Sequence, residues 1–156
     1  MTQLEFAHRG ARACHLMHAE ELSRFLDAWR LAAQAGVPLP LTRNPSYASL
    51  DALLHHVLRY ARWYMTWISS NLGLDPPDLP ECPEMSSARS QADEYVASLG
   101  AAWGTCLAEV PPSRFTETYS VPWGVTYSID SMLEHAVMHP RRHRFQIEEW
   151  IATLPR

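Results

Sequence analysis

The sequence predicts an all-α protein built as a four-helix bundle, because three observations agree. Four long segments repeat apolar residues at spacings of three and four, which is the period of one helix face. Most prolines fall between these segments rather than inside them. No long segment alternates apolar and polar residues as a half-buried strand does. Amphipathic helices without a sheet bury their apolar faces against one another, which gives a bundle.

The first two helices have the clearest patterns. The first is expected over about residues 12–35, and Gly36 follows it as a C-terminal stop. The second is expected over about residues 47–72, where a sustained apolar stripe runs through the whole segment. Ser46 or Ser49 is the candidate N-cap of this helix, and Gly73 marks its end.

The third and fourth helices follow a Pro-rich connection. The third is expected over about residues 88–110, although Gly100 and Gly104 weaken its pattern. The fourth is expected over about residues 128–153, with Ser128 as its N-cap. Between them, residues 115–121 are rich in β-branched and aromatic types, which suits one arm of a short hairpin.

The order of the helices depends on the connection after the second one. An extended chain advances up to ~3.5 Å per residue and a helix only ~1.5 Å. The Pro-rich connection is therefore long enough to return along the second helix, so that helices two and three run parallel. The expected order is up-down-down-up, in a single domain covering residues 1–156.

Composition excludes several classes of function. The net charge is −4, which argues against a nucleic-acid partner because such proteins need clustered positive charge. No apolar run is long enough to span a membrane. The three cysteines are far apart and form no C-x-x-C pair, so we expect a reducing cytoplasm rather than a disulfide framework. No lysine is present, which excludes Schiff-base chemistry.

The fourth helix carries His135, His139 and His143 at four-residue intervals. A pair at this spacing presents both imidazoles on one face, within reach of one divalent ion. On a helical wheel, His143 lies about 50° from the apolar centre, His139 about 90° and His135 about 130°. We therefore favour His139 and His143 as ligands. The alternative is that each histidine is an ordinary surface or hydrogen-bonded residue, as we expect for His8, His15 and His18.

A third ligand should come from a facing helix. The second helix offers His55 and His56, which the wheel does not separate because they flank the apolar stripe on opposite sides. His56 shares its flank with three aromatic residues at spacings of four, three and four, which are Tyr60, Trp63 and Trp67. An aromatic row beside a polar point lines a small-molecule pocket, or it simply packs in the core.

These segments resemble the DinB-like family of metalloenzymes, also described as DinB/YfiT-like. "LEHAVMHPRRHRFQI" is similar to the family's last helix, roughly L-x-H-x-x-x-H-x-x-x-H-R-G-Q-I. "SLDALLHHVLRYARWY" resembles its second helix, S-x-x-E-x-L-x-H, and places the family histidine on His56. The resemblance extends over about residues 45–150. Pro140 and Phe145 depart from it, since an acidic residue and glycine are common there.

The resemblance implies a four-helix bundle, commonly a homodimer, with a divalent metal held by His56, His139 and His143. Zinc or nickel suits imidazole ligands, and iron or manganese also binds them. Three ligands leave a coordination position open, as in catalytic rather than structural sites. Tyr60, Trp63 and Trp67 are the expected pocket wall. Arg144 is the expected contact for an acidic cofactor, unless the basic cluster Arg141, Arg142 and Arg144 is only a solvated face.

Two enzymatic functions are compatible with such a site, both on a small-molecule substrate. The first is transfer of a low-molecular-weight thiol to a small electrophile, as the resemblance to thiol-dependent transferases implies. The second is metal-dependent hydrolysis. We favour thiol transfer, because the sequence places no evident general base or nucleophile beside the ligands. A third hypothesis is a non-catalytic bundle that only binds metal or a small molecule.

Overall fold

The secondary structure is mostly helical, as the sequence predicts. A computed structural model describes residues 5–75 and 77–155 of the chain. Within that part, the only sheet is one antiparallel two-stranded hairpin. The elements in chain order are α1 (Arg9–Ala35), η1 (Pro45–Tyr47), α2 (Leu50–Asn71), α3 (Met85–Leu107), η2 (Pro112–Thr116), β1 (Thr118–Ser120), β2 (Thr126–Ser128) and α4 (Ile129–Ala152).

The start of α4 was predicted correctly from its capping residue, whereas the starts of α1 and α3 were not. α4 begins after Ser128, whose hydroxyl oxygen accepts a hydrogen bond from the backbone N–H of Ser131 at 3.1 Å, as predicted. α1 begins earlier than residue 12, because Nδ1 of His8 accepts a hydrogen bond from the backbone N–H of Ala11 at 2.9 Å. Histidine is not among the usual helix caps. α3 has no side-chain cap, and the predicted range lies about one turn too far along the chain.

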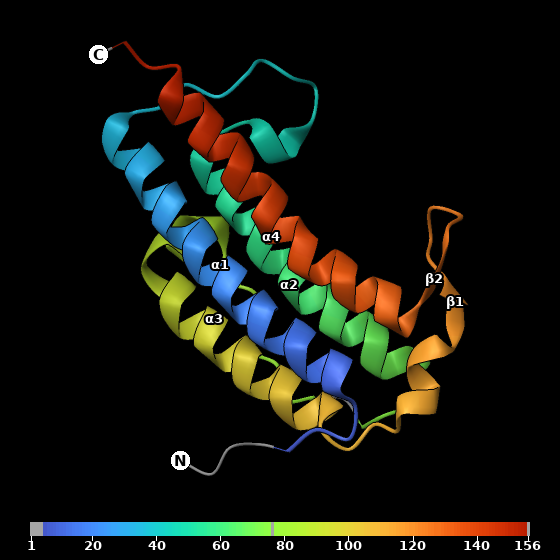
Figure 1. Cartoon of the computed structure of the whole chain (residues 1–156). Helices are drawn as coiled ribbons and strands as arrows, with labels where there is room; N and C mark the ends of the chain where they lie inside the picture. The colour runs from blue at the N-terminus through green and yellow to red at the C-terminus, as the bar shows by residue number, and fades with distance from the viewer. Residues whose placement is uncertain (1–4, 76, 156) are drawn as a thin grey trace.

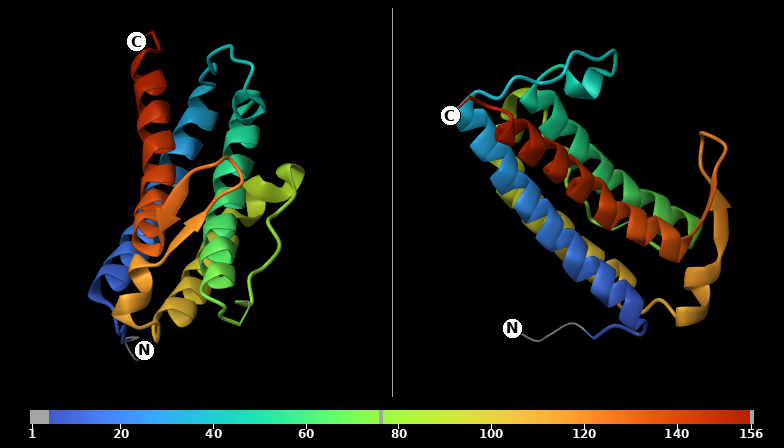
Figure 2. Two further views of the ribbon diagram at one scale, coloured as in Figure 1. Left: turned by 90° about the vertical axis from the view of Figure 1, so that its right-hand side faces the viewer. Right: turned by 45° about the horizontal axis from the view of Figure 1, so that its top comes forward.

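Each long helix packs against two neighbours (Figure 1). α4 lies against α1 and α2, and α3 lies against the same two helices. The colours show that α2 and α3 both run towards the end of the molecule that carries the hairpin, whereas α1 and α4 run away from it. The connection after α2 therefore returns the chain along the length of that helix, a path that Figure 2 also shows.

The core consists of two clusters of buried side chains. The cluster near the end of α4 includes Phe25 and Leu58, and the cluster near the hairpin includes Trp103 and Phe115. Large side chains buried in this way contribute about 1.5–3 kcal/mol each to folding. Along α4, Ala136 belongs to the hairpin cluster and Ile147 to the other, so the stretch between them lies where the two clusters meet.

The hairpin is held at the end of α2. Its first strand lies within the predicted residues 115–121, which confirms a short hairpin arm there. Arg114 precedes it and donates a hydrogen bond to the carbonyl of Leu72 at 3.0 Å. Gly124 in the turn has φ 83°, a conformation that favours glycine. In the left view of Figure 2 the hairpin crosses the face between α4 and α2, and Trp123 in its turn is 52% exposed.

None of the helices in the described residues is long and apolar enough to cross a membrane.

Candidate metal centre

Three histidines from two helices meet at one point. His56 comes from α2, and His139 and His143 lie about one turn apart on α4. One ring nitrogen of each lies within 4.8 Å of the others, and the Nε2 atoms of His56 and His139 are 3.1 Å apart. Two imidazole nitrogens on one tetrahedral ion, with bonds of ~2.0–2.1 Å, stand about 3.3 Å apart. The three histidines are therefore close enough to hold a metal ion.

The site is largely withdrawn from water. His139 is 5% exposed and His143 is 1% exposed, while His56 is half-buried. The two α4 histidines lie in the stretch between the two core clusters, on the flank of α4 that faces α2. Packing on both sides of this stretch fixes the two imidazoles relative to the helix on which they sit. His56 is thus the most exposed of the three histidines.

In two of the three histidines, the ring nitrogen that points away from the cluster contacts a polar side chain. Nδ1 of His56 is 3.0 Å from the hydroxyl of Ser46. Nδ1 of His143 is 2.9 Å from the amide oxygen of Gln146, and that oxygen also accepts a hydrogen bond from the Tyr47 hydroxyl at 3.1 Å. Ser46 and Tyr47 both belong to η1, so this short helix helps to orient a histidine on each of two long helices. Such outer contacts fix the tautomer and orientation of metal-binding histidines.

The hydrogen bonds of His143 determine where its lone pair lies. The amide oxygen of Gln146 can only accept, so Nδ1 of His143 carries the proton. Its Nε2 then holds a buried lone pair without a hydrogen-bond partner among the described residues. A hydrogen bond between His56 and His139 accounts for their 3.1 Å separation but leaves this lone pair unsatisfied. A shared cation satisfies the inward nitrogens of all three rings.

Burial keeps the three imidazoles neutral at pH 7. It is the main cause that lowers the pKa of His56 and of His143 to about 4, and it lowers the pKa of His139 to about 2. The positive charge of Arg142 adds a smaller lowering in each case. A neutral imidazole offers the lone pair that a metal requires.

The other two histidines considered as ligands lie outside the cluster. His135 is half-buried, and its ring packs edge-on against Tyr64 and Tyr127 at centroid distances of 5.6 and 5.7 Å. His55 precedes His56 but does not join the cluster. His135 and His55 therefore provide matched controls for the three clustered histidines.

The expectation of a surface position is wrong for His18. It is only 2% exposed, and its ring stacks on the indole of Trp103 with centroids 4.4 Å apart. The reason is visible in the helix period, because His18 precedes the buried Leu22 and Phe25 by four and seven positions and so shares their face. Burial lowers the pKa of His18 to about 3.

Of the three aromatic residues expected to form the pocket wall, Tyr60 lies beside the histidines and Trp63 lies next to Tyr60. The ring of Tyr60 is 4.7 Å from that of His56, and Trp63 packs against the indole of Trp123 at 5.4 Å. Trp67 is buried and farther along α2. A pocket of about 250 Å³ opens here, lined by Arg59, Tyr60, Trp63 and Trp123. Trp123 comes from the hairpin turn, and no periodicity in the sequence pointed to it.

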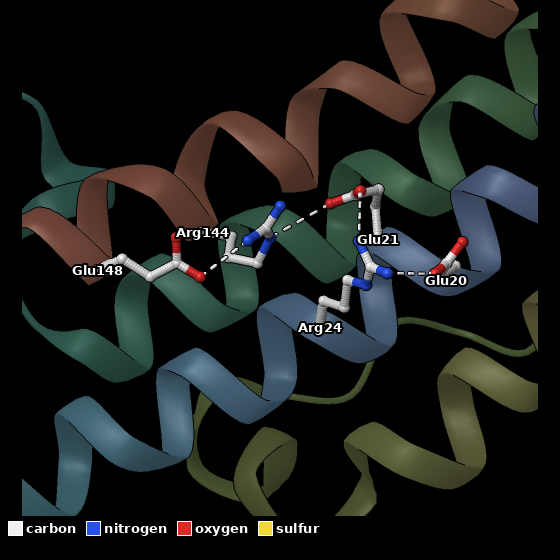
Figure 3. A network of polar contacts seen from close by, with 5 residues as sticks. All are labelled: Glu20, Glu21, Arg24, Arg144 and Glu148. Atoms are coloured by element: carbon white, nitrogen blue, oxygen red, sulfur yellow. Dashed lines mark hydrogen bonds and ion pairs between the residues drawn. The ribbon is translucent and has the colours of Figure 1, made fainter.

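Arg144 is engaged in a network between α4 and α1 (Figure 3). Its guanidinium lies 3.3 Å from the carboxylate of Glu21 and 2.8 Å from that of Glu148, and it covers the ring of Phe145 at 4.6 Å. The side chains of Arg144 and Glu21 are 13% and 7% exposed. Arg144 thus forms an ion pair that links α4 to α1. It does not line the pocket that contains His139.

A different arginine shares a pocket with one histidine of the cluster. Arg142, His135, His139 and Gln146 line a pocket of about 410 Å³ on α4. Arg142 follows His139 by three positions, so both side chains lie on one helix face. The helical period therefore distinguishes the two arginines, since Arg144 falls on the opposite side of α4, towards α1.

The three cysteines lie outside the histidine cluster. All are free and half-buried. Burial is the main cause that raises the pKa of each thiol above its ordinary value. A thiol with a raised pKa stays protonated at neutral pH, so none of the three is an activated nucleophile.

Comparison of the chain with protein-family models, with curated proteins and with solved structures found no match.

Proposed function

We propose that the chain is a metal-dependent enzyme of the DinB-like type, a four-helix bundle with up-down-down-up order. In this proposal His56, His139 and His143 hold one divalent ion, with zinc or nickel favoured by the all-nitrogen ligands and iron or manganese also suited. The observation that carries the proposal is the unsatisfied, buried Nε2 of His143 beside two further imidazoles. Three protein ligands are typical of sites that keep a position open for chemistry.

The favoured reaction is transfer of a low-molecular-weight thiol to a small electrophile. A bound divalent ion supplies Lewis acidity and stabilises a thiolate. The chain's own residues hold the ligands in place through Ser46 and Gln146, and Tyr60 covers one side of the site. Its own thiols have raised pKa values, which supports a thiol brought from outside. We place this chemistry in the cytoplasm, where such thiols remain reduced.

Metal content tests the metal site directly. Purified wild-type protein, expressed with added zinc or nickel, is expected to carry about one metal ion per chain. His143→Ala and His56→Ala should each lose it, while His135→Ala and His55→Ala should retain it. Mass spectrometry of the metal gives the answer, and circular dichroism shows that the variants are folded. Metal-free wild type, or equal metal loss in the control variants, contradicts the proposal and favours the non-catalytic bundle.

The type of reaction is tested with substrates. A panel of small electrophiles is offered with glutathione, mycothiol or bacillithiol, and product is followed by chromatography. Turnover that requires both metal and thiol supports the transferase. Turnover without any thiol identifies a hydrolase, the second candidate. Size-exclusion chromatography with light scattering tests the homodimer that belongs to the same proposal.

A further inference from the structure

Two arginines beside the histidine cluster have no charge partner. Among the described residues, neither Arg59 nor Arg142 forms an ion pair or a hydrogen bond, although Arg59 covers the ring of Tyr60 at 5.3 Å. Both side chains are exposed. Arg144, in contrast, is held by two carboxylates. The two unpaired guanidinium groups are therefore available to a ligand.

Both arginines hold the same position relative to a ligand histidine. Arg59 follows His56 by three residues on α2, and Arg142 follows His139 by three residues on α4. Residues at this spacing are neighbours on a helix surface. Each of the two helices that supply ligands thus also supplies one positive charge next to its histidine.

The two pockets contain these arginines together with parts of the site. Arg142 lines the pocket of about 410 Å³ that includes His139. Arg59 lines the pocket of about 250 Å³ that includes Tyr60, whose ring is 5.2 Å from that of His139. The larger volume lies within the range of about 300–1,000 Å³ that is usual for small-molecule sites.

The charge of the site is unbalanced without an anion. An imidazole never carries a negative charge at ordinary pH, and among the described residues no carboxylate joins the three histidines. A divalent ion adds two positive charges to those of Arg59 and Arg142. Glu149 lines the same pocket as Arg142, but it lies seven positions farther along α4, or about 10 Å. Electrostatic complementarity therefore favours a negatively charged ligand at the histidine end.

We propose that the substrate or co-substrate of this site is a small organic anion with a flat apolar part. Its acidic group pairs with Arg142 beside His139, with Arg59 adding charge from α2. Its apolar part lies against Tyr60, whose ring is 5.2 Å from that of His139, because aromatic faces bind flat apolar groups. This inference rests on the proposed function for its metal, and it names the chemical class that the pocket selects.

Benzoate and its neutral isostere benzamide are suitable probes, with binding to the zinc-loaded protein measured by calorimetry. Benzoate is expected to bind at least about tenfold more tightly than benzamide, since a charge-assisted pair with arginine is the difference between them. Arg142→Gln should remove most of this preference and leave benzamide binding unchanged. Tyr60→Ala should weaken both probes to a similar extent.

Arg141→Gln is the matched control. It removes the same charge from the same helix, but Arg141 lies over Phe145 at 5.5 Å and is not part of the pocket lining. Equal binding of the two probes, or equal loss of benzoate affinity in the Arg141 and Arg142 variants, overturns the inference.

Metal analysis of the same samples separates the two proposals. If the protein retains zinc but shows no preference for benzoate, only the anion inference fails. If the protein binds no metal, the proposed function fails, and the anion inference is tested on the metal-free protein. A preference for benzoate that is lost in Arg142→Gln supports the inference. The absence of any such preference refutes it.

Discussion

Replacing Gln146 with leucine tests whether the orientation of His143 matters for metal binding. The amide oxygen of Gln146 accepts the Nδ1–H of His143 at 2.9 Å and fixes the tautomer with Nε2 directed inward. Loss of such an outer contact typically lowers metal affinity about 10- to 100-fold. The hydroxyl of Tyr47 lies 3.5 Å from the same Nδ1 and can take over part of the role. We therefore expect about a tenfold loss in Gln146→Leu, and about a hundredfold loss when Tyr47→Phe is added.

The assay is competition for zinc with a chromophoric chelator at pH 7.5, which gives the dissociation constant of each variant. Gln146→Glu is the informative control, because a carboxylate accepts the same hydrogen bond more strongly and should preserve or tighten zinc binding. Exposed Gln91 on α3 provides a second control, since Gln91→Leu should leave the constant unchanged. An unchanged zinc affinity in the Gln146→Leu, Tyr47→Phe double variant would refute the reasoning about the His143 tautomer.

Three further outcomes concern stability. Arg144→Met should lower the free energy of unfolding, measured with urea, by about 2 kcal/mol, because it leaves Glu21 charged and buried. Adding Glu21→Leu should restore most of that loss. If the double variant recovers no stability, Arg144 and Glu21 do not stabilise the fold as a pair. In the metal-free protein, burial lowers the pKa of His18 to about 3. Below about pH 6.5 the unfolded chain protonates this histidine and the folded chain does not, so the contribution of buried His18 to the free energy of unfolding declines as the pH falls. The wild type should then lose about 2 kcal/mol more than His18→Leu between pH 6.5 and 5, and parallel pH curves exclude this role. Ser128→Ala should lower the free energy of unfolding by about 1 kcal/mol and reduce the melting temperature, because it removes the N-cap of α4. An unchanged melting temperature would show that this cap does not stabilise the fold.

The sequence was most informative where the geometry is local. Apolar spacing located four helices, and the wheel selected His139 and His143 over His135 because spacing within one helix is fixed by its period. The same wheel left His55 and His56 undecided, since the choice depends on how α2 packs against α4. The structure brings His56 to the two α4 histidines.

The remaining site residues come from segments without periodicity. Ser46 lies in η1 and Trp123 lies in the hairpin turn, and their positions depend on the path of the chain rather than on a helical pattern. On the wheel of α4, Arg142 shares a face with His139, whereas Arg144, the expected contact, falls on the side towards α1. His8 was missed as a helix cap because the usual signals do not include histidine.

The separation of His56 and His139 along the chain has a consequence for opening motions. These residues are 83 positions apart, so an ion held between them closes a loop that spans more than half of the protein. The ion would cross-link α2 and α4 and so restrict the unfolded chain, as a disulfide does. Hydrogen exchange should then slow in both helices together when metal is added, while the fraying ends of α1 and α3 exchange as before.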